Sequence, residues 1–232
     1  MMPRDPSAAP THDPPSLPVG SSPCNCQLTQ LEVKLVVVTG GPGAGKTAVL
    51  EMARRSFCKH IAILPEAAGI VFGGGFPRLN SLAGRCASQR AIYHIQRELE
   101  AVALAAKQDI TVALCDRGTI DGSAYWPPAA GSYWEALGTS VESELRRYAA
   151  VILLRTPDVS QGFDHSNPLR QESAEQAAVL DQRIADAWSR HLRRVEVPSR
   201  TDFLDKARVV LELVRAELPA CCRGHDIDLT RS

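Results

Sequence analysis

One segment of the chain has the residue types and the spacing needed to hold a row of phosphates. It fits the pattern G-x-x-x-x-G-K-[ST] at every fixed position and consists of Gly40, Gly41, Pro42, Gly43, Ala44, Gly45, Lys46 and Thr47. The glycines let the backbone turn tightly and bring its N–H groups against phosphate oxygens. Lys46 would add a compact positive charge at the β- and γ-phosphates, and Thr47 would offer a hydroxyl to Mg²⁺. The segment therefore predicts a nucleoside triphosphate site, with ATP preferred over GTP and Mg²⁺ bound beside it.

The residues on either side of this segment support the same interpretation. Leu31, Val33 and Leu35 run into three consecutive valines at 36–38, which predicts a buried strand before the loop. A helix is expected from about residue 46 to 57, and its N-terminus would add the positive end of its dipole to the phosphate site. A chance match in a glycine-rich turn would lack this strand-loop-helix context.

Two carboxylates are expected at the ends of neighbouring strands, beside the phosphates. Asp116 follows the apolar run 110–115 and would hold Mg²⁺ directly or through water, although an aspartate there can also cap a turn. Glu66 follows the apolar run 61–64 and would take a proton from an acceptor hydroxyl. On position alone, Glu66 could equally be a carboxylate at a helix N-terminus that faces the helix dipole.

Three arginines are candidates for phosphate contacts. Arg117 follows Asp116 and would reach a phosphate or an acceptor group, with a surface salt bridge as the alternative. Arg170 lies in the polar segment 156–172, which is typical of a lid loop. A lid arginine would neutralise the transferring phosphoryl group, whereas an arginine without that role would simply be solvated. Arg155, at the end of the fourth expected strand, is a weaker candidate for the same kind of contact with the nucleotide.

Two adjacent aromatic residues also lie near the expected site. Tyr125 and Trp126 follow a short polar stretch and could stack on the ring of an acceptor. Such a pair more often covers the edge of a hydrophobic core, and we favour that interpretation.

The cysteines give no metal-binding pattern of their own. Cys24 with Cys26, and Cys221 and Cys222 with His225, could in principle converge on a metal. Neither group has zinc-finger spacing, and both lie in expected tails, so we predict reduced thiols.

The hydrophobic pattern predicts an α/β fold in which strands alternate with helices. Strands are expected at residues 31–38, 61–64, 110–115, 151–154 and 195–197, and helices at 46–57, 84–107, 139–148, 173–188 and 202–217. This alternation predicts a parallel sheet with helices on both faces. The glycine-rich residues 69–80 are expected to form a mobile loop. Residues 31–219 would form one nucleotide-binding domain, between a disordered tail at 1–30 and a flexible tail at 220–232.

Composition restricts the class of partner. The 26 lysines and arginines balance the 26 aspartates and glutamates, so neither nucleic acid nor an anionic membrane is expected as the main partner. The sequence has no apolar run of about 18 residues, and residues 1–30 lack the apolar stretch typical of a signal peptide, so we expect neither a transmembrane segment nor a signal peptide. We expect a cytoplasmic protein whose partners are a nucleoside triphosphate and an unknown small-molecule acceptor.

Five stretches of the sequence resemble one family. They are residues 40–47, Pro65-Glu66-Ala67-Ala68, Gln89-Arg90-Ala91-Ile92, Cys115-Asp116-Arg117-Gly118-Thr119 and Asp121-Gly122-Ser123-Ala124-Tyr125-Trp126. They look like the stand-alone "AAA domain" P-loop proteins, which are related to the ribosylnicotinamide kinase domain of bifunctional regulators of NAD biosynthesis. The likeness runs from about residue 33 to 216. It implies a P-loop kinase fold, a three-layer αβα sandwich with strand order 2-3-1-4-5 and a lid segment.

The resemblance also implies roles for individual residues. In nucleoside kinases an acidic residue after the second strand acts as a base, and Glu66 stands at that place. An acidic residue followed by arginine after the third strand serves metal and substrate, and Asp116 and Arg117 stand there. Many members of the family have no assigned reaction, and one animal branch is regarded as a GTP- and lipid-binding regulator.

The sequence is therefore compatible with two functions. The first is a small-molecule kinase that passes the γ-phosphoryl group of Mg-ATP to a hydroxyl of a nucleoside-like acceptor. The alternative is a regulatory protein that binds ATP or GTP and hydrolyses it slowly or not at all.

Overall fold

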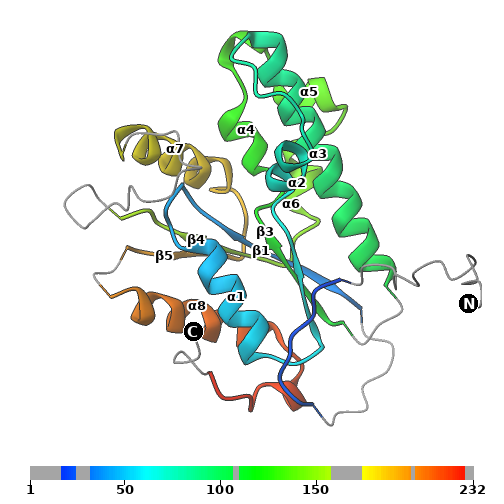
Figure 1. Ribbon diagram of the computed structural model, residues 1–232, viewed down its shortest axis with the longest axis vertical. Helices are drawn as coiled ribbons and strands as arrows, with labels where there is room; N and C mark the ends of the chain where they lie inside the picture. Colours follow the sequence, from blue (N-terminus) through cyan, green and yellow to red (C-terminus); the bar gives the residue numbers. More distant parts are fainter. Residues whose placement is uncertain (1–16, 25–31, 107–109, 158–173, 200–201, 228–232) are drawn as a thin grey trace, which may run out of the picture.

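Four of the five strands of the sheet are buried along almost their whole length. The computed structural model describes residues 17–24, 32–106, 110–157, 174–199 and 202–227, and Figure 1 shows how they are arranged. The strands are β1 (Lys34–Thr39), β2 (Ile61–Leu64), β3 (Val112–Asp116), β4 (Ala150–Leu154) and β5 (Arg194–Val197). All are parallel and lie in the order β2-β3-β1-β4-β5. The predicted α/β fold and strand order are confirmed.

Helices cover both faces of this sheet. They are α1 (Lys46–Ser56), α2 (Ala67–Gly73), α3 (Leu82–Ala105), α4 (Asp121–Tyr125), α5 (Tyr133–Leu137), α6 (Val141–Leu145), α7 (Ala174–Ala187) and α8 (Phe203–Glu217). Two 3₁₀ turns are formed by Pro128–Ala130 and Ala220–Cys222. In Figure 1, α1 and α8 lie on one face, while α3, α4, α6 and α7 lie on the other.

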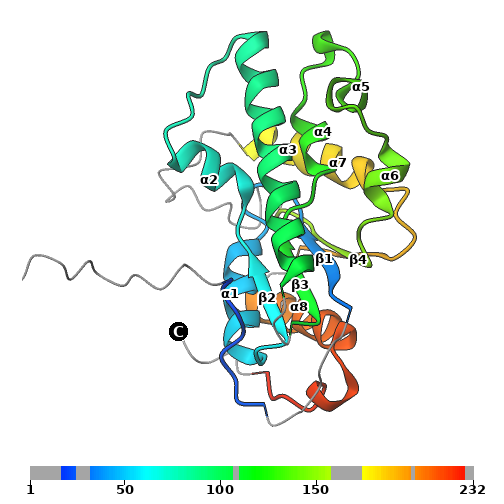
Figure 2. The same cartoon turned by 90° about the vertical axis from the view of Figure 1, so that its right-hand side faces the viewer.

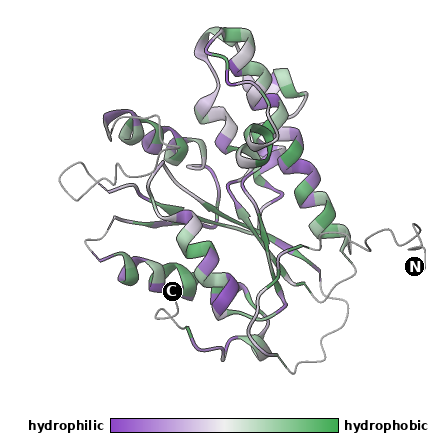
Figure 3. Cartoon of the chain, in the orientation of Figure 1, coloured by the Kyte–Doolittle hydropathy of each residue, from purple (hydrophilic) through white to green (hydrophobic). Residues whose placement is uncertain are grey.

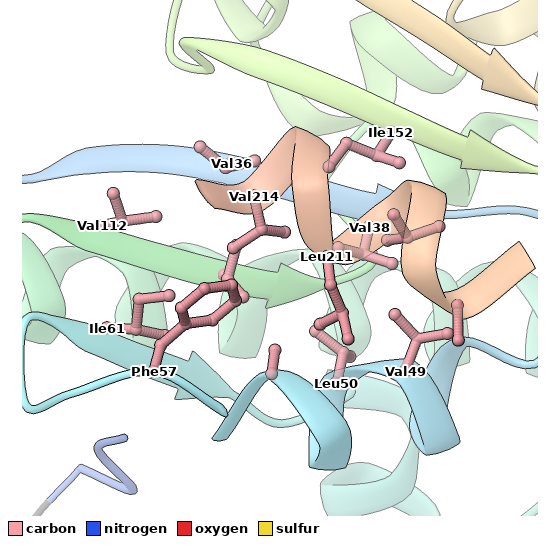
Figure 4. Close-up of a cluster of buried hydrophobic side chains, with 14 of the residues drawn as sticks. Val36, Val38, Val49, Leu50, Phe57, Ile61, Val112, Ile152, Leu211 and Val214 are labelled. Carbon is pink, nitrogen blue, oxygen red and sulfur yellow. The ribbon is translucent and has the colours of Figure 1, made fainter. Parts of the chain in front are cut away.

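The two faces of each strand belong to two separate hydrophobic clusters. Because successive side chains of a strand point to opposite faces, Val36 and Val38 of β1 contact α1 and α8, whereas Leu35 and Val37 contact the other layer. Figure 4 shows the first cluster, in which Leu50 of α1 faces residues of α8 beneath the sheet. In Figure 3, β1 to β4 are accordingly green along most of their length, whereas β5 alternates between hydrophilic and hydrophobic residues.

Several helices differ from the expectation. The segment 69–80, expected to be a mobile loop, begins inside α2, which starts directly after Glu66. The helix expected from Thr139 begins at Val141, because Ser140 is its N-cap and accepts a hydrogen bond from the Ser143 N–H at 3.2 Å. The hydroxyl of Thr139 instead donates to a buried glutamate. Helices α4 and α5 have five residues each, which is too short for apolar periodicity to predict them.

Parts of both expected tails are folded against the domain. Within 1–30, residues 17–24 lie along the outer edge of β2, where the Gly20 N–H donates to the Ile61 carbonyl at 2.9 Å and the Ile63 N–H donates to the Pro18 carbonyl at 2.8 Å. Within 220–232, Cys222 is fully buried. Figure 2 shows the first of these segments in dark blue beside β2. The expectation that both regions are loose is wrong for these residues, because they satisfy an open sheet edge and cover apolar side chains.

The order of the strands determines where a ligand would bind. β1 lies between β3 and β4, so the connections after β1 and β3 diverge at the carboxyl edge of the sheet. In open parallel sheets such a point forms a ligand crevice. Among the described residues, no helix has both the length and the apolar character needed to cross a bilayer.

Candidate functional site

The glycine-rich segment forms the loop between the end of β1 and the start of α1. Gly40, Gly43 and Gly45 have φ angles of 139°, 79° and 91°, in the region that side chains disfavour. A Cβ atom on Gly40 would lie 1.9 Å from the Leu154 carbonyl oxygen, so glycine is required where the loop crosses the end of β4. The loop therefore has the tight left-handed turns that turn main-chain N–H groups toward an anion.

Lys46 begins α1 and is buried beneath this loop. Its Nζ atom donates to the carbonyl oxygens of Gly40 and Gly41, both at 3.0 Å. Burial, followed by repulsion from Arg117, lowers the pKa of Lys46 to about 8, although nearby carboxylates act in the opposite direction. An anion bound in the loop would favour the charged form of Lys46, so electrostatic attraction favours the binding of phosphate.

Three polar side chains hold the loop from outside, and sequence reasoning missed all of them. Asp181 of α7 accepts a hydrogen bond from the Gly41 N–H at 2.9 Å. Thr156, directly after β4, donates from its hydroxyl to the Pro42 carbonyl at 3.2 Å. Lys206 of α8 donates from Nζ to the Ala44 carbonyl at 3.0 Å. In the sequence, Asp181 and Lys206 are recognisable only as charged residues beside the apolar face of an expected helix. This pattern does not indicate which group each side chain contacts.

Arg155 does not point directly at the loop. Its Nε atom pairs with Asp181 Oδ2 at 2.7 Å, and its Nη1 atom lies 3.3 Å from Glu196. Since Asp181 also binds Gly41, Arg155 reaches the phosphate loop through this aspartate. A direct contact between Arg155 and a nucleotide stays a prediction.

Asp116 lies at the end of β3, in register with Val38, the residue of β1 that precedes Thr39 and the loop. Its Oδ1 atom is buried and has no hydrogen-bond partner among the described residues. Burial is the main cause that raises the pKa of Asp116 to about 6, against the attraction of Lys46. Thr47 is exposed in the first turn of α1. A buried, unpartnered carboxylate oxygen and an accessible hydroxyl are the hard oxygen donors that suit Mg²⁺.

Glu66 and Arg117 form an ion pair beside the loop. Arg117 Nε donates to Glu66 Oε1 at 2.7 Å, and Arg117 Nη1 donates to the Gly40 carbonyl at 3.1 Å. Burial alone would raise the pKa of Glu66, but Arg117 and then Lys46 outweigh it and lower the pKa below its usual value. Glu66 precedes α2 without capping it through its side chain. The structure thus brings Glu66, Arg117 and Lys46 together.

The backbone of Arg117 is strained. Its φ of 72° is the only positive value for a non-glycine residue among the residues described. This conformation costs of order 1–3 kcal/mol and is found mostly where surrounding contacts enforce it. Here those contacts are the bonds to Glu66 and Gly40 and a 3.1 Å bond from Nη1 to Asp121 Oδ1.

Asp121 is a further buried residue to which sequence reasoning assigned no role. It accepts hydrogen bonds from the Thr39 hydroxyl, from the Gly118 N–H at 3.1 Å and from Trp188 Nε1 at 3.0 Å, besides the bond from Arg117. Asp121 therefore joins the end of β1 to the segment after β3 and orients Arg117. Its position five residues after Asp116 was visible in the sequence, but its partners were not.

An open cavity of about 470 Å³ lies between α4 and the first turns of α7, and Lys46, Glu66, Asp116 and Arg117 do not line it. Its wall includes Tyr125, Arg85, Glu175 and Arg183. The Tyr125 ring centroid is 5.7 Å from the guanidinium carbon of Arg117, which links the cavity to the phosphate site. Trp126 has the structural role that we favoured, because it is buried and its ring lies 5.3 Å from the ring of Tyr133. Tyr125 also packs against the second hydrophobic cluster, as we favoured, and it lines the cavity as well.

Arg170 lies outside the described residues, as does most of the segment 156–172 that was expected to form a lid. Its role as a lid arginine therefore stays a prediction.

Comparisons with known proteins agree with this architecture. The family described as AAA domain matches residues 35–206, whereas a comparison with curated proteins gives no match. Among solved structures, NadR protein in complex with NR gives a TM-score of 0.62 at 14% identity, covering 87% of this chain and 54% of that one. NadR protein in complex with NAD and AMP-PNP gives 0.56 at 12% identity, with 87% and 52% covered.

A third solved structure matches over nearly its full length. Thymidylate kinase from Candida albicans gives a TM-score of 0.55 at 15% identity, covering 81% of this chain and 93% of that one. The present chain spans about half the length of the two NadR chains. At these identities the likeness shows the fold, which is that of the P-loop kinases.

Proposed function

The chain belongs to the AAA domain family, and on this premise we propose that it is a small-molecule kinase. It transfers the γ-phosphoryl group of Mg-ATP to a hydroxyl of a nucleoside-like acceptor. The observation that carries the proposal is the Glu66–Arg117 ion pair beside the phosphate loop, with its Nε–Oε1 distance of 2.7 Å. Glu66 is half-buried, so its carboxylate stays accessible to an acceptor while Arg117 balances its charge.

Each residue of the site has a part in this reaction. The main-chain amides of the loop and Lys46 bind the phosphates, and Arg117 adds positive charge beside Gly40, where charge builds on the transferred group. Thr47 and Asp116 would hold Mg²⁺, which supplies further neutralisation of the phosphate oxygens when bound. Glu66, kept ionised by its lowered pKa, accepts the proton of the attacking hydroxyl. The acceptor oxygen bonds to phosphorus as the bond to ADP breaks.

The cavity beside Tyr125 supports the choice of acceptor. Its volume of about 470 Å³ suits a molecule of nucleoside size. Tyr125 offers an aromatic face for a ring, and Arg85, Glu175 and Arg183 offer charged groups for polar substituents. Arg117 lies 5.7 Å from the centroid of the Tyr125 ring, which connects the wall of this cavity to the Glu66–Arg117 pair.

Transfer of labelled γ-phosphate from ATP to a panel of nucleosides, nucleoside monophosphates and small alcohols tests the proposal. We expect transfer to at least one ring-bearing acceptor, and Glu66→Gln should lower its turnover about 10²-fold or more while ATP affinity stays the same. Glu51→Gln is the matched control, because Glu51 is an exposed carboxylate of α1 that pairs with Arg54 and Arg55. Unchanged transfer by Glu66→Gln would remove Glu66 from the role of base.

A second candidate, a nucleotide-dependent regulator, is favoured by the bond between Gly41 and Asp181. This bond connects the phosphate loop to α7, so a nucleotide that reshapes the loop would also shift this helix. Hydrogen exchange across α7 with and without Mg-ATP tests it. Strong nucleotide-dependent protection in α7, together with no transfer to any acceptor, would favour the regulator over the kinase.

A further inference from the structure

Four potential metal ligands meet at the edge of the sheet opposite the phosphate loop. They are the sulfur atoms of Cys24, Cys58 and Cys222 and a ring nitrogen of His60, and all four lie within 4.8 Å of one another. Cys58 and His60 directly precede β2, whereas Glu66 of the phosphate site follows it. The cluster is therefore separate from the candidate active site.

The individual distances fit one tetrahedral ion. Cys24 Sγ and Cys222 Sγ are 3.7 Å apart, and His60 Nδ1 lies 3.1 Å from Cys58 Sγ and 3.3 Å from Cys222 Sγ. Sulfurs bound to one tetrahedral zinc at about 2.3 Å lie roughly 3.8 Å apart, and a sulfur and a nitrogen somewhat less. A disulfide between Cys24 and Cys222 would instead require about 2.05 Å.

The backbone around these ligands is already fixed. Cys58 and His60 lie in a turn that the Ile61 N–H closes by donating to the Cys58 carbonyl at 3.1 Å, and this turn brings His60 Nδ1 within 3.1 Å of Cys58 Sγ. The His60 carbonyl accepts hydrogen bonds from the N–H groups of Thr111 and Val112 at 2.8 and 3.0 Å. A Cβ atom on Gly20 would lie 2.3 Å from the Cys58 carbonyl oxygen, so only glycine lets the N-terminal segment approach this closely.

We propose that Cys24, Cys58, His60 and Cys222 form a structural Zn²⁺ site that ties both terminal segments to the connection between α1 and β2. Three thiolates and one imidazole are the donors that suit zinc rather than Mg²⁺ or Ca²⁺. Four protein ligands complete a tetrahedral shell and leave no position for a substrate, so the site is structural. Cys58, His60 and Cys222 are fully buried, which protects such a shell from water.

A zinc ion at this site would stabilise the fold, because its ligands are far apart in the sequence. Cys24 and Cys222 are separated by 198 residues, and a common ion would close that loop through Cys58 and His60. Closing a loop of this length restricts the unfolded chain strongly, so zinc should stabilise the folded protein. Sequence reasoning missed the site because it considered Cys24 with Cys26 and Cys222 with its neighbours, and no spacing rule connects them to residues 58 and 60.

The test is metal analysis and X-ray absorption of the full-length protein, expressed without a polyhistidine tag and dialysed against EDTA. We expect about one zinc per chain, with a shell of three sulfurs near 2.3 Å and one nitrogen near 2.0–2.1 Å. Absence of zinc, or a shell dominated by oxygen, would overturn the proposal. So would a Cys24–Cys222 disulfide found by mass spectrometry in protein alkylated at lysis.

Variants make the assignment specific to these residues. Cys58→Ser and Cys222→Ser should weaken zinc binding more than tenfold, and Cys24→Ser, at a half-buried position, gives a readout if the first two fail to fold. Cys86→Ser is the matched control, because Cys86 is a buried thiol in a different cluster. Cobalt substituted into wild type and Cys86→Ser should show thiolate charge-transfer bands that lose intensity in Cys24→Ser, which keeps two of the three thiolates. Equal zinc affinity in Cys24→Ser and wild type would contradict the four-ligand site.

Discussion

Glu144 and Asp116 are both buried carboxylates near the end of β3, but their surroundings differ. Glu144, on α6, accepts hydrogen bonds from the hydroxyls of Thr119, Tyr93 and Thr139 at 2.8–3.0 Å. It also pairs with Arg97 at 3.0 Å and Arg147 at 2.9 Å. Burial alone would raise the pKa of Glu144, yet these donors together lower it.

Asp116 lies only three residues before Thr119, but it has no such set of partners. Its Oδ1 atom has none among the described residues, and its pKa is raised to about 6, mainly by burial. A carboxylate with both oxygens bonded by several surrounding donors, as in Glu144, leaves no oxygen for a ligand and belongs to the fold. One whose charge is left unsatisfied destabilises the fold and is expected where a ligand, here Mg²⁺, completes the site.

The largest effect is expected where the satisfied carboxylate is altered. Glu144→Gln replaces acceptors with an amide that faces the donors around it and removes the charge that pairs with Arg147. Breaking a buried pair in this way should lower the free energy of unfolding by about 3–5 kcal/mol, measured by urea denaturation. Arg97→Gln is the control, since this arginine is partly exposed and its pair with Glu144 should contribute less than about 1 kcal/mol. Similar losses in both variants would contradict the comparison.

Asp116→Asn should raise the free energy of unfolding, whereas Glu144→Gln should lower it. At pH 7.5 without Mg²⁺, the neutral side chain should raise the free energy of unfolding by about 3 kcal/mol, because a pKa of about 6 instead of 3.8 means that the folded state disfavours the charged carboxylate. Wild-type stability should accordingly fall as the pH rises from about 4 through about 6, and this slope should be smaller in Asp116→Asn. The same variant should lose most of the Mg²⁺-dependent part of ATP binding. A less stable variant at pH 7.5 would mean that the fold itself uses this charge.

The parts of the molecule that local patterns specify were predicted well. Four apolar runs became strands with shifts of a few residues, because a buried strand needs only a short hydrophobic stretch between turns. The strand order came from the family resemblance, since no local pattern determines which strands pair. Helix α2 was missed because Gly69 and Gly73 lower its helix propensity, although Glu66 was correctly expected to follow β2.

The parts that depend on distant partners were not predicted. Asp181 binds Gly41 across 140 residues, and Lys206 binds Ala44 across 162. Asp116 and Glu66 could be proposed because strand ends converge at one edge of the sheet, but Asp181 comes from a helix whose docking no sequence pattern specifies. The cysteine cluster has the same origin, since its ligands come from three segments that meet only in the folded chain.

Lys46 is a buried positive charge in the phosphate site, and burial disfavours its charged form as it does that of Asp116. Because burial lowers its pKa to about 8, the unliganded site loses the lysine proton as the pH rises from 7 to 9. Affinity for a fluorescent triphosphate at constant Mg²⁺ should therefore fall about tenfold across that range, or about 1.4 kcal/mol. Lys46→Arg, which keeps its charge, should show a flat profile whatever its absolute affinity. A flat wild-type profile would show that the loop keeps this lysine fully charged.

Arg155 is expected to give the smallest effect, because its charge is already satisfied. Its Nε atom pairs with Asp181 and its Nη1 atom with Glu196, and the side chain is a quarter exposed. Since it acts on the loop only through Asp181, Arg155→Gln should weaken ATP binding threefold or less, under about 1 kcal/mol. Arg117→Gln is the matched comparison, because Arg117 contacts Gly40 directly and should lose more than tenfold. If Arg155→Gln lost as much as Arg117→Gln, Arg155 would itself contact the nucleotide, as the sequence suggested.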